Sequence, residues 1–223
     1  SDDEIQEQYT ADASKLSVEE LLYAATLSED SKEQNDIYLK TTQLYASDYR
    51  AYNNLAVLAY QNGDMSTAKK YLNLASQKQP NSAEVNANQA LIAMAEGKYE
   101  EANNHLMKAT AASNYNEVLG NLQIAAGNYA QAAQSLKGVK TNSAALAQIL
   151  DKDYASASKT LKQVAHADAM TSYLKAIVAA RTNQDSEAIN ELKQAFATLK
   201  SRAAKDLEFV TLFNNSAFQS AVK

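Results

Sequence analysis

The sequence has few of the residues that end or bend regular structure, with five Gly and one Pro among 223 residues. β-Sandwiches and barrels need many turns, and turns use Gly for positive φ and Pro for a fixed φ. Folds of that kind are therefore excluded. What the chain has in quantity is Ala, Leu, Lys, Gln and Glu, all of them good helix formers. The composition predicts an all-α fold with short loops.

Cysteine is absent, and the only two histidines are His105 and His166. Without Cys the chain has no disulfide, no thiolate metal site and no cysteine nucleophile. The two histidines stand in widely separated parts of the sequence, whereas two metal ligands on one helix would be three or four positions apart. We therefore expect no metal site.

Other catalytic patterns are missing too. The sequence has no Gly-x-Ser-x-Gly elbow and no glycine-rich phosphate loop. Paired acids such as Glu100 and Glu101 are adjacent, so their side chains point apart on a helix and form no acid–base couple. Helix capping explains the serines near expected helix starts, which are Ser66, Ser82, Ser143 and Ser186. We predict that the protein is not an enzyme and has no catalytic residue and no cofactor.

Positive charge and long apolar runs are scarce as well. Only three residues are Arg, and Lys and Arg form no cluster, so we expect no binding of nucleic acid. No apolar run reaches the length of roughly 18 residues that a membrane-spanning helix needs, so we expect no transmembrane segment. The net charge is −5, but the first 50 residues alone hold 12 acids and 4 bases. Residues 1–16 are predicted to form an acidic, partly ordered N-terminal segment.

The sequence repeats itself with a period of about 34 residues. Gly63 and Gly97 stand one such period apart, and Gly127 follows after a slightly shorter interval. Lys152 and Asn183 occupy the same place in two further copies. In each copy an apolar helical stripe ends at this residue, where the chain can take positive φ. A second helix then begins, and its early small residue lets the two helices cross closely; these small residues are Ala68, Ala102, Ala132, Ala157 and Ala188.

This pattern resembles the tetratricopeptide repeat, a helical hairpin of about 34 residues. The best copy places Tyr52 where the family has Trp, and the next copy departs from the family by having Gln89 where Leu is usual. The other matched positions of the best copy are Leu55, Ala56, Gly63, Ala68, Leu72, Ala75 and Pro80. The resemblance covers residues from about 50 to 195. It implies an α-α superhelix, a right-handed solenoid of about five to six hairpins with a C-terminal capping helix.

The resemblance also predicts how the chain is divided. Residues 17–199 would form the repeat domain, which opens with a degenerate hairpin of helices 18–27 and 32–45 capped by Ser31. Residues 200–223 resemble the capping helices that close such arrays. Their larger apolar residues are Leu207, Phe209, Val210, Leu212, Phe213 and Phe218.

Two short stretches are similar to repeat regions of envelope-associated proteins from the Bacteroidetes. They are the opening Leu16-Ser-Val-Glu-Glu-Leu-Leu and the stretch Arg50-Ala-Tyr-Asn-Asn-Leu. This similarity implies a periplasmic or cell-envelope location, with a cytoplasmic one left open. It also leaves open that the chain is a repeat module of a larger outer-membrane-associated protein. The sequence has no signal for an oligomeric state.

In the tetratricopeptide-repeat family, certain positions of each first helix face the concave side of the solenoid and contact a protein or peptide partner. Mapped onto this sequence, the partner-binding residues are Arg50, Asn53, Val57, Tyr60, Gln61, Ala87, Leu91, Met94, Asn121 and Ile124. Apolar side chains mixed with amides favour an extended or helical peptide. The Lys residues of the family's carboxylate clamp are missing, which disfavours an acidic C-terminal tail. We therefore predict a non-catalytic interaction scaffold or adaptor.

The alternative is a protein that captures a small ligand or a glycan at the cell envelope. Such a site would need aromatic platforms, and the chain has no Trp. Tyr23, Tyr60 and Tyr173 fall on expected first helices, where they could face the concave side. Their wide spacing in the sequence does not favour one shared platform.

Overall fold

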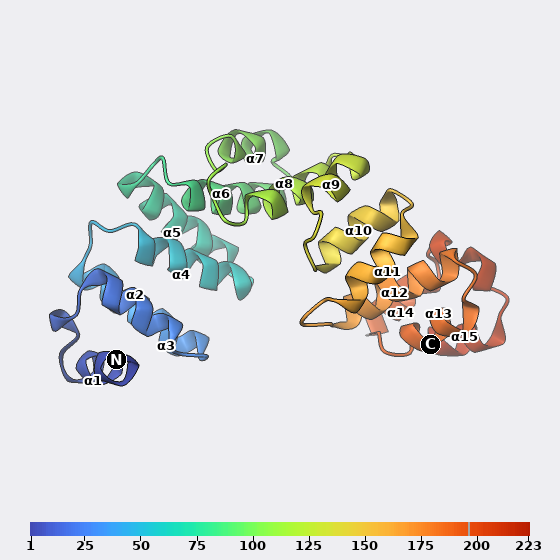
Figure 1. Cartoon of the computed structure of the whole chain (residues 1–223), viewed down its shortest axis with the longest axis horizontal. Coiled ribbons are helices and arrows are strands. Elements are labelled where there is room, and N and C mark those ends of the chain that lie inside the picture. The colour runs from blue at the N-terminus through green and yellow to red at the C-terminus, as the bar shows by residue number, and fades with distance from the viewer. Residues whose placement is uncertain (196) are drawn as a thin grey trace. The chain divides into compact units, whose positions relative to one another are not determined.

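The computed structural model describes residues 1–195 and 197–223, and it has no β-strand in those residues. This confirms the predicted all-α fold. The chain divides into two compact units, Ser1–Val118 (unit 1) and Leu119–Lys223 (unit 2). The boundary falls inside one helix, α8 (Tyr115–Ala125). In each unit, consecutive helices pair into hairpins (Figure 1).

Unit 1 begins with a separate helix and continues with hairpins. The pairs α2–α3, α4–α5 and α6–α7 each pack together along their length. The elements are α1 (Asp2–Asp12), η1 (Ala13–Lys15), α2 (Val18–Thr26), α3 (Ser31–Leu44), α4 (Arg50–Gln61), α5 (Met65–Lys78), α6 (Ala83–Ala95) and α7 (Tyr99–Leu106).

Unit 2 continues the series with shorter hairpins and ends in a compact C-terminal segment. The hairpins here are α10–α11 and α12–α13, and α9 packs against α10. The elements after α8 are α9 (Tyr129–Ser135), α10 (Asn142–Leu150), α11 (Tyr154–Lys162), α12 (Ala169–Arg181), α13 (Asp185–Leu192), α14 (Ala197–Ala203), η2 (Leu207–Leu212) and α15 (Ser216–Ala221).

The turns between the paired helices have one geometry. Gly63, Gly97 and Gly127 have φ of 76°, 76° and 80°, and Lys152 and Asn183 have φ of 62° and 60°. The residue after each of them donates its N–H to a carbonyl five residues back at 2.8 Å, which is the bond of a Schellman C-cap. The prediction of positive φ at these five positions is confirmed. Gly138, which the repeat does not mark, also has positive φ.

Small residues set how closely the two helices of a hairpin approach. The five alanines predicted for the second helices are fully buried. The Leu four residues after each of them is buried too, because positions i and i+4 share one helix face. In unit 2, Gly120 allows a close approach, since a Cβ there would lie 2.4 Å from Cγ of Leu136.

The acidic N-terminal region contains an ordered helix. Residues 2–12 form α1, which begins with a capping box made by Ser1 and Glu4. Ile5 and Tyr9 of α1 pack against the buried side chains of Leu16 and Leu21. The apolar face of α1 therefore covers the start of the first hairpin.

The first hairpin forms where it was predicted, with one correction at its second helix. Its helices span Val18–Thr26 and Ser31–Leu44. The N-cap of α3 is Asp30 and not Ser31, because the Asp30 carboxylate accepts a hydrogen bond of 2.9 Å from the N–H of Lys32.

Capping by serine is also less common than predicted. Ser82 caps α6, accepting from the N–H of Val85. At the other three predicted sites the N-cap residues are Asp64, Thr141 and Gln184, each two positions earlier. The prediction was wrong there because each helix begins before the serine, which then lies within its first turn.

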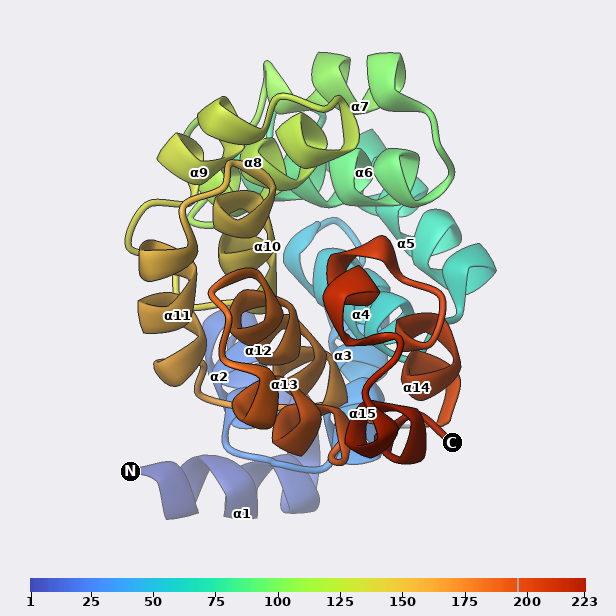
Figure 2. The ribbon, with the colours of Figure 1, turned by 90° about the vertical axis from the view of Figure 1, so that its right-hand side faces the viewer.

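The C-terminal segment of unit 2 packs on the last hairpin. Phe209 of η2 and Phe218 of α15 are buried in one core with α12 and α13, and α13 and α15 lie side by side (Figure 2). The ring of Phe209 meets Tyr173 of α12 edge-on at 5.7 Å between centroids. By contrast, Leu207 is 74% exposed and takes no part in this core. Helix α14 begins at Ala197 and therefore spans the predicted boundary at residue 200.

Within the described residues, no helix has both the length and the hydrophobicity needed to cross a membrane.

Candidate binding groove in unit 1

A hollow of about 220 Å³ opens between α4 and α6 in unit 1. We call it the α4–α6 groove. Its floor is apolar, its rim holds amides, and none of the described residues that line it is charged. The lining residues are Ala56, Val57, Tyr60, Gln61, Leu72, Asn88, Leu91, Ile92 and Asn114.

Helical spacing brings these side chains to one surface. Val57, Tyr60 and Gln61 lie three and four positions apart along α4, and Asn88 and Leu91 lie three apart along α6. Val57 and Leu91 are half-buried, and Tyr60 is 38% exposed. The groove therefore has an apolar base with an aromatic side chain at its edge.

An asparagine pair lies beside the base of the groove. Nδ2 of Asn88 donates a hydrogen bond of 2.9 Å to Oδ1 of Asn53. This bond uses Oδ1 of Asn53 and Nδ2 of Asn88, so it does not engage Nδ2 of Asn53 or Oδ1 of Asn88. One amide donor and one amide acceptor of the pair thus remain, and a peptide group has the matching acceptor and donor. Asn53 is itself only 8% exposed.

Four of the residues predicted to bind a partner line this groove: Val57, Tyr60, Gln61 and Leu91. Asn53 lies next to it through its bond to Asn88. Sequence reasoning missed Asn88, which also lines the groove. Asn88 could have been found, because it precedes Leu91 by three positions on the same face of α6.

The remaining predicted residues lie elsewhere. Ala87 needs correction, because it is fully buried among neighbouring helices and presents no side chain to a partner. Met94 is half-buried outside the lining of the groove. Asn121 and Ile124 belong to the part of α8 in unit 2, where Ile124 packs against the cluster that contains Leu136.

Arg50 lies at the start of α4, and its guanidinium forms ion pairs with two carboxylates. Its guanidinium lies 2.7 Å from Asp48 and 3.1 Å from Glu19. Hydrogen bonding to Arg50 lowers the pKa of Asp48. The pKa of Glu19 is lowered mainly by a hydrogen bond from its own backbone N–H and, to a smaller extent, by the hydrogen bond from Arg50. With all three groups ionised, this cluster carries a net charge of −1.

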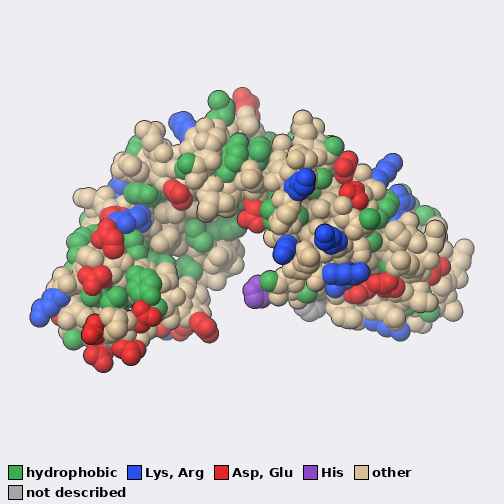
Figure 3. Space-filling model, viewed as in Figure 1, with side chains coloured by type: hydrophobic (Ala, Val, Ile, Leu, Met, Phe, Trp, Pro, Cys, Tyr) green, Lys and Arg blue, Asp and Glu red, His purple; other side chains and the backbone are tan. Residues whose placement is uncertain are grey.

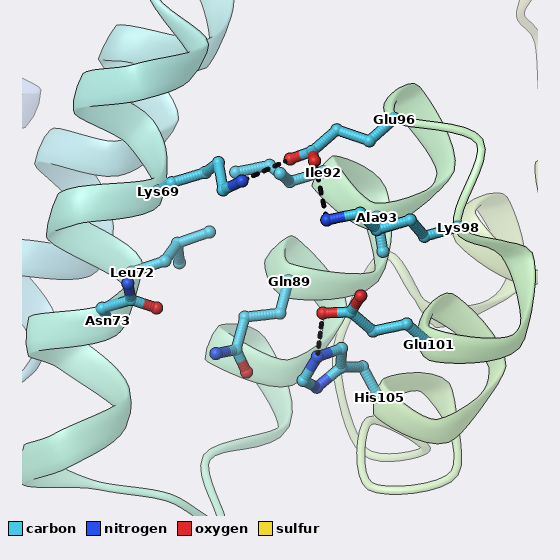
Figure 4. Close-up of a pocket in the computed structure, with 10 residues that line it drawn as sticks. All are labelled: Lys69, Leu72, Asn73, Gln89, Ile92, Ala93, Glu96, Lys98, Glu101 and His105. Atoms are coloured by element: carbon cyan, nitrogen blue, oxygen red, sulfur yellow. Dashed lines mark ion pairs between the residues drawn. The ribbon is translucent and has the colours of Figure 1, made fainter.

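A second, polar cleft of about 70 Å³ lies between α5 and the α6–α7 hairpin (Figure 4). Glu96 bridges Lys69 at 2.9 Å and Lys98 at 3.0 Å. His105 lies 3.8 Å from Glu101, and burial lowers the pKa of His105 despite this neighbour. The charges in the cleft therefore largely neutralise one another.

Similar clefts recur at the same place in other hairpins. One lies between α3 and the α4–α5 hairpin, and another between α11 and the α12–α13 hairpin. A cleft that recurs with the repeat follows from the stacking of hairpins and marks no special site. Across the described part of the chain, no three His, Asp or Glu side chains are grouped so as to hold a metal ion.

No protein-family model and no curated protein sequence matches the chain. Solved structures do match. The chain is similar to PilF of Pseudomonas aeruginosa, with 18% identity over 95% of this chain and 97% of that one, at a TM-score of 0.58. It is also similar to a tetratricopeptide repeat protein from Parabacteroides merdae, with 12% identity over 99% and 89% of the two chains, at a TM-score of 0.61.

A third similar structure is PilW, described as a widely conserved type IV pilus biogenesis factor. The identity is 17% over 88% of this chain and 98% of that one, at a TM-score of 0.62. At such identities the likeness concerns the fold. The shared fold agrees with the period of the sequence, the five equivalent turns and the buried alanines of the second helices. The chain therefore has the tetratricopeptide-repeat fold that its sequence predicts.

Proposed function

We propose that this protein is a non-catalytic interaction module and that its α4–α6 groove binds a peptide segment of a partner protein. The observation that carries the proposal is the apolar, uncharged groove with an unpaired amide donor and acceptor beside it. An apolar base accepts a partner side chain, and burying that side chain is favourable by roughly 1.5–3 kcal/mol.

The asparagine pair would hold the backbone of the bound segment. A peptide carbonyl can accept from Nδ2 of Asn53, and a peptide N–H can donate to Oδ1 of Asn88. Hydrogen bonds to the main chain are independent of the partner's sequence, while the pocket selects a side chain. This division favours a peptide over a small organic ligand.

The glycan alternative receives no comparable support. Tyr173 is 1% exposed and belongs to the core of unit 2, and the hydroxyl of Tyr23 donates to Asp2. Of Tyr23, Tyr60 and Tyr173, only Tyr60 lines the groove, and all residues of unit 1 are described. A single tyrosine is a poor platform for a sugar.

We place the protein at the cell envelope. PilW is described as a factor of type IV pilus biogenesis, which is a process of the cell envelope, and PilW has the same fold. This location agrees with the similarity of two short stretches to envelope-associated repeat proteins.

The test selects peptides from a random displayed library on the full chain and measures their affinity for variants. We expect Tyr60→Ala with Leu91→Ala to weaken the selected peptides by about tenfold or more, because two anchor contacts are lost. The control is Tyr99→Ala, an exposed tyrosine on α7 outside the groove, which should bind as the original protein does. Circular dichroism verifies that both variants are folded. Equal binding by the groove variant, or a library that yields no peptide, would contradict the proposal.

A further inference from the structure

Nearly all the bases of unit 1 lie away from its first helices. Unit 1 contains 18 acids and 9 bases, a net charge of −9. Of the bases, only Arg50 lies on the first helices α2, α4 and α6. Helices α4 and α6 supply most of the groove lining, to which α5 adds Leu72. The other eight bases lie on η1, α3 and α5 or beside the ends of α7; they are Lys15, Lys32, Lys40, Lys69, Lys70, Lys78, Lys98 and Lys108.

Arg50 does not supply a free positive charge either. Asp48 and Glu19 both contact its guanidinium, so the cluster as a whole is negative. A partner carboxylate near the groove would therefore meet no unpaired cation on the first helices of this fully described unit.

Exposed carboxylates stand on the same helix faces as the groove residues. Glu84 precedes Asn88 by four positions and Leu91 by seven, which places it on the same face of α6. Glu117 follows Asn114 by three positions, in the first turn of α8. Both are exposed, and neither forms an ion pair within the described residues.

The acidic character continues over the start of unit 1. Glu19 and Glu20 lie in the first turn of α2, and α1 has three acids in its own first turn. Figure 3 shows carboxylates gathered over the part of unit 1 that contains α1–α3. The groove is thus an uncharged, apolar depression in a unit whose net charge is negative.

We propose that the segment bound in the groove is basic, with one apolar side chain that enters the groove and Lys or Arg residues on either side of it. This inference rests on the proposed function and names the class of its partner. The uncharged lining selects the apolar anchor, and the surrounding carboxylates select positive flanks by attraction and disfavour acidic ones by repulsion. It also agrees with the missing carboxylate clamp.

The test compares three sets of fluorescently labelled nonapeptides by polarisation with the full chain. Each set has Leu, Ile, Met, Phe or Tyr at its centre, and the sets differ only in having two Lys, two Gln or two Glu on each side. We expect affinity to fall in the order Lys, Gln, Glu. We expect roughly tenfold or more between the first and last at low ionic strength, and much less at about 0.5 M salt, where exposed charges are screened.

Two matched variants locate the effect. Glu84→Gln with Glu117→Gln should reduce the preference for the Lys peptides severalfold and leave the Gln peptides unchanged. Glu29→Gln with Glu100→Gln removes the same charge from exposed acids outside the groove and should leave the preference intact.

The outcomes separate the two proposals. Equal binding of all three sets, lost on Tyr60→Ala with Leu91→Ala, would overturn the basic partner and leave the groove as a peptide site. Stronger binding of the Glu set, or equal effects of the two double variants, would also overturn it. Absence of binding by every set would overturn the peptide-binding groove itself, and the basic partner with it.

Discussion

At the scale of single residues, one backbone requirement recurs in five turns and is met in two ways. Gly63, Gly97 and Gly127 take positive φ without strain, whereas Lys152 and Asn183 carry a Cβ in the same conformation. A left-handed conformation costs a residue with a Cβ about 1–2 kcal/mol, and Asn tolerates it better than Lys does. Lys152 is therefore the strained member of the series.

Lys152→Gly should accordingly stabilise the protein by about 0.5–1 kcal/mol, because relief of strain exceeds the larger entropy of Gly in the unfolded chain. Asn183→Gly should gain less. Urea denaturation followed by circular dichroism measures both. A lower midpoint for Lys152→Gly would show that the turn is not strained.

His105 predicts how stability depends on pH. Burial lowers its pKa below the usual 6.5, so the folded state holds this proton less tightly than the unfolded state. His105 therefore does not reduce the free energy of unfolding above pH 6.5. As the pH falls through that value, the free energy of unfolding declines, because the unfolded chain takes up more protons at this residue. The variant His105→Gln should lose less stability than the original protein between pH 7 and pH 5. Parallel curves for the two proteins in denaturation at each pH would contradict this.

At the scale of helices, most of the architecture could be predicted from the sequence. The turn residues and the small residues of the second helices follow from local rules, so the positions of the α4–α5 and α6–α7 hairpins in the sequence could be predicted accurately. The errors concern helix starts. Asp30 and not Ser31 begins α3, because either residue can cap a helix and only the backbone conformation decides between them.

The crossing of α8 and α9 provides a test at this scale. Gly120→Ala would place a Cβ about as close as 2.4 Å to Leu136, and overpacking of this kind costs about 1–3 kcal/mol. Alanine is otherwise better than glycine within a helix by roughly 0.5–1 kcal/mol, so a net destabilisation identifies the clash. Adding Leu136→Ala should remove much of the clash, and a double-mutant cycle of Tm values should show coupling. A higher Tm for Gly120→Ala alone would mean that the helices separate at little cost.

At the scale of the whole molecule, contacts between segments far apart in sequence decide what is buried. The core of unit 2 joins Tyr173 to Phe209 and Phe218 from the C-terminal segment. The hydroxyl of Tyr173 donates to Asp206. The repeat pattern does not include these contacts, because the C-terminal segment lies outside the repeat.

Phe209→Ala should destabilise unit 2 by about 3–5 kcal/mol, since it empties a fully buried aromatic site. Its neighbour Val210 is 52% exposed, and Val210→Ala should change the free energy of unfolding by less than about 0.5 kcal/mol. Denaturant titrations of both variants measure the difference. Similar effects of the two substitutions would mean that the C-terminal segment contributes little to the core.

The sequence by itself determined the helical class, the repeat, the positions of the turns and the face of each first helix. These features depend on interactions between residues close together in the chain, such as a left-handed turn residue or side chains three and four positions apart. The sequence also showed the excess of acids at the start of the chain.

Only the tertiary structure decided which residues of those faces remain open to a partner. Ala87 and Tyr173 have the helical spacing of exposed positions, yet neighbouring helices cover them. Asn88 was not predicted, yet it lines the α4–α6 groove. Exposure depends on side chains contributed by distant parts of the sequence, and a local pattern contains no information about those neighbours.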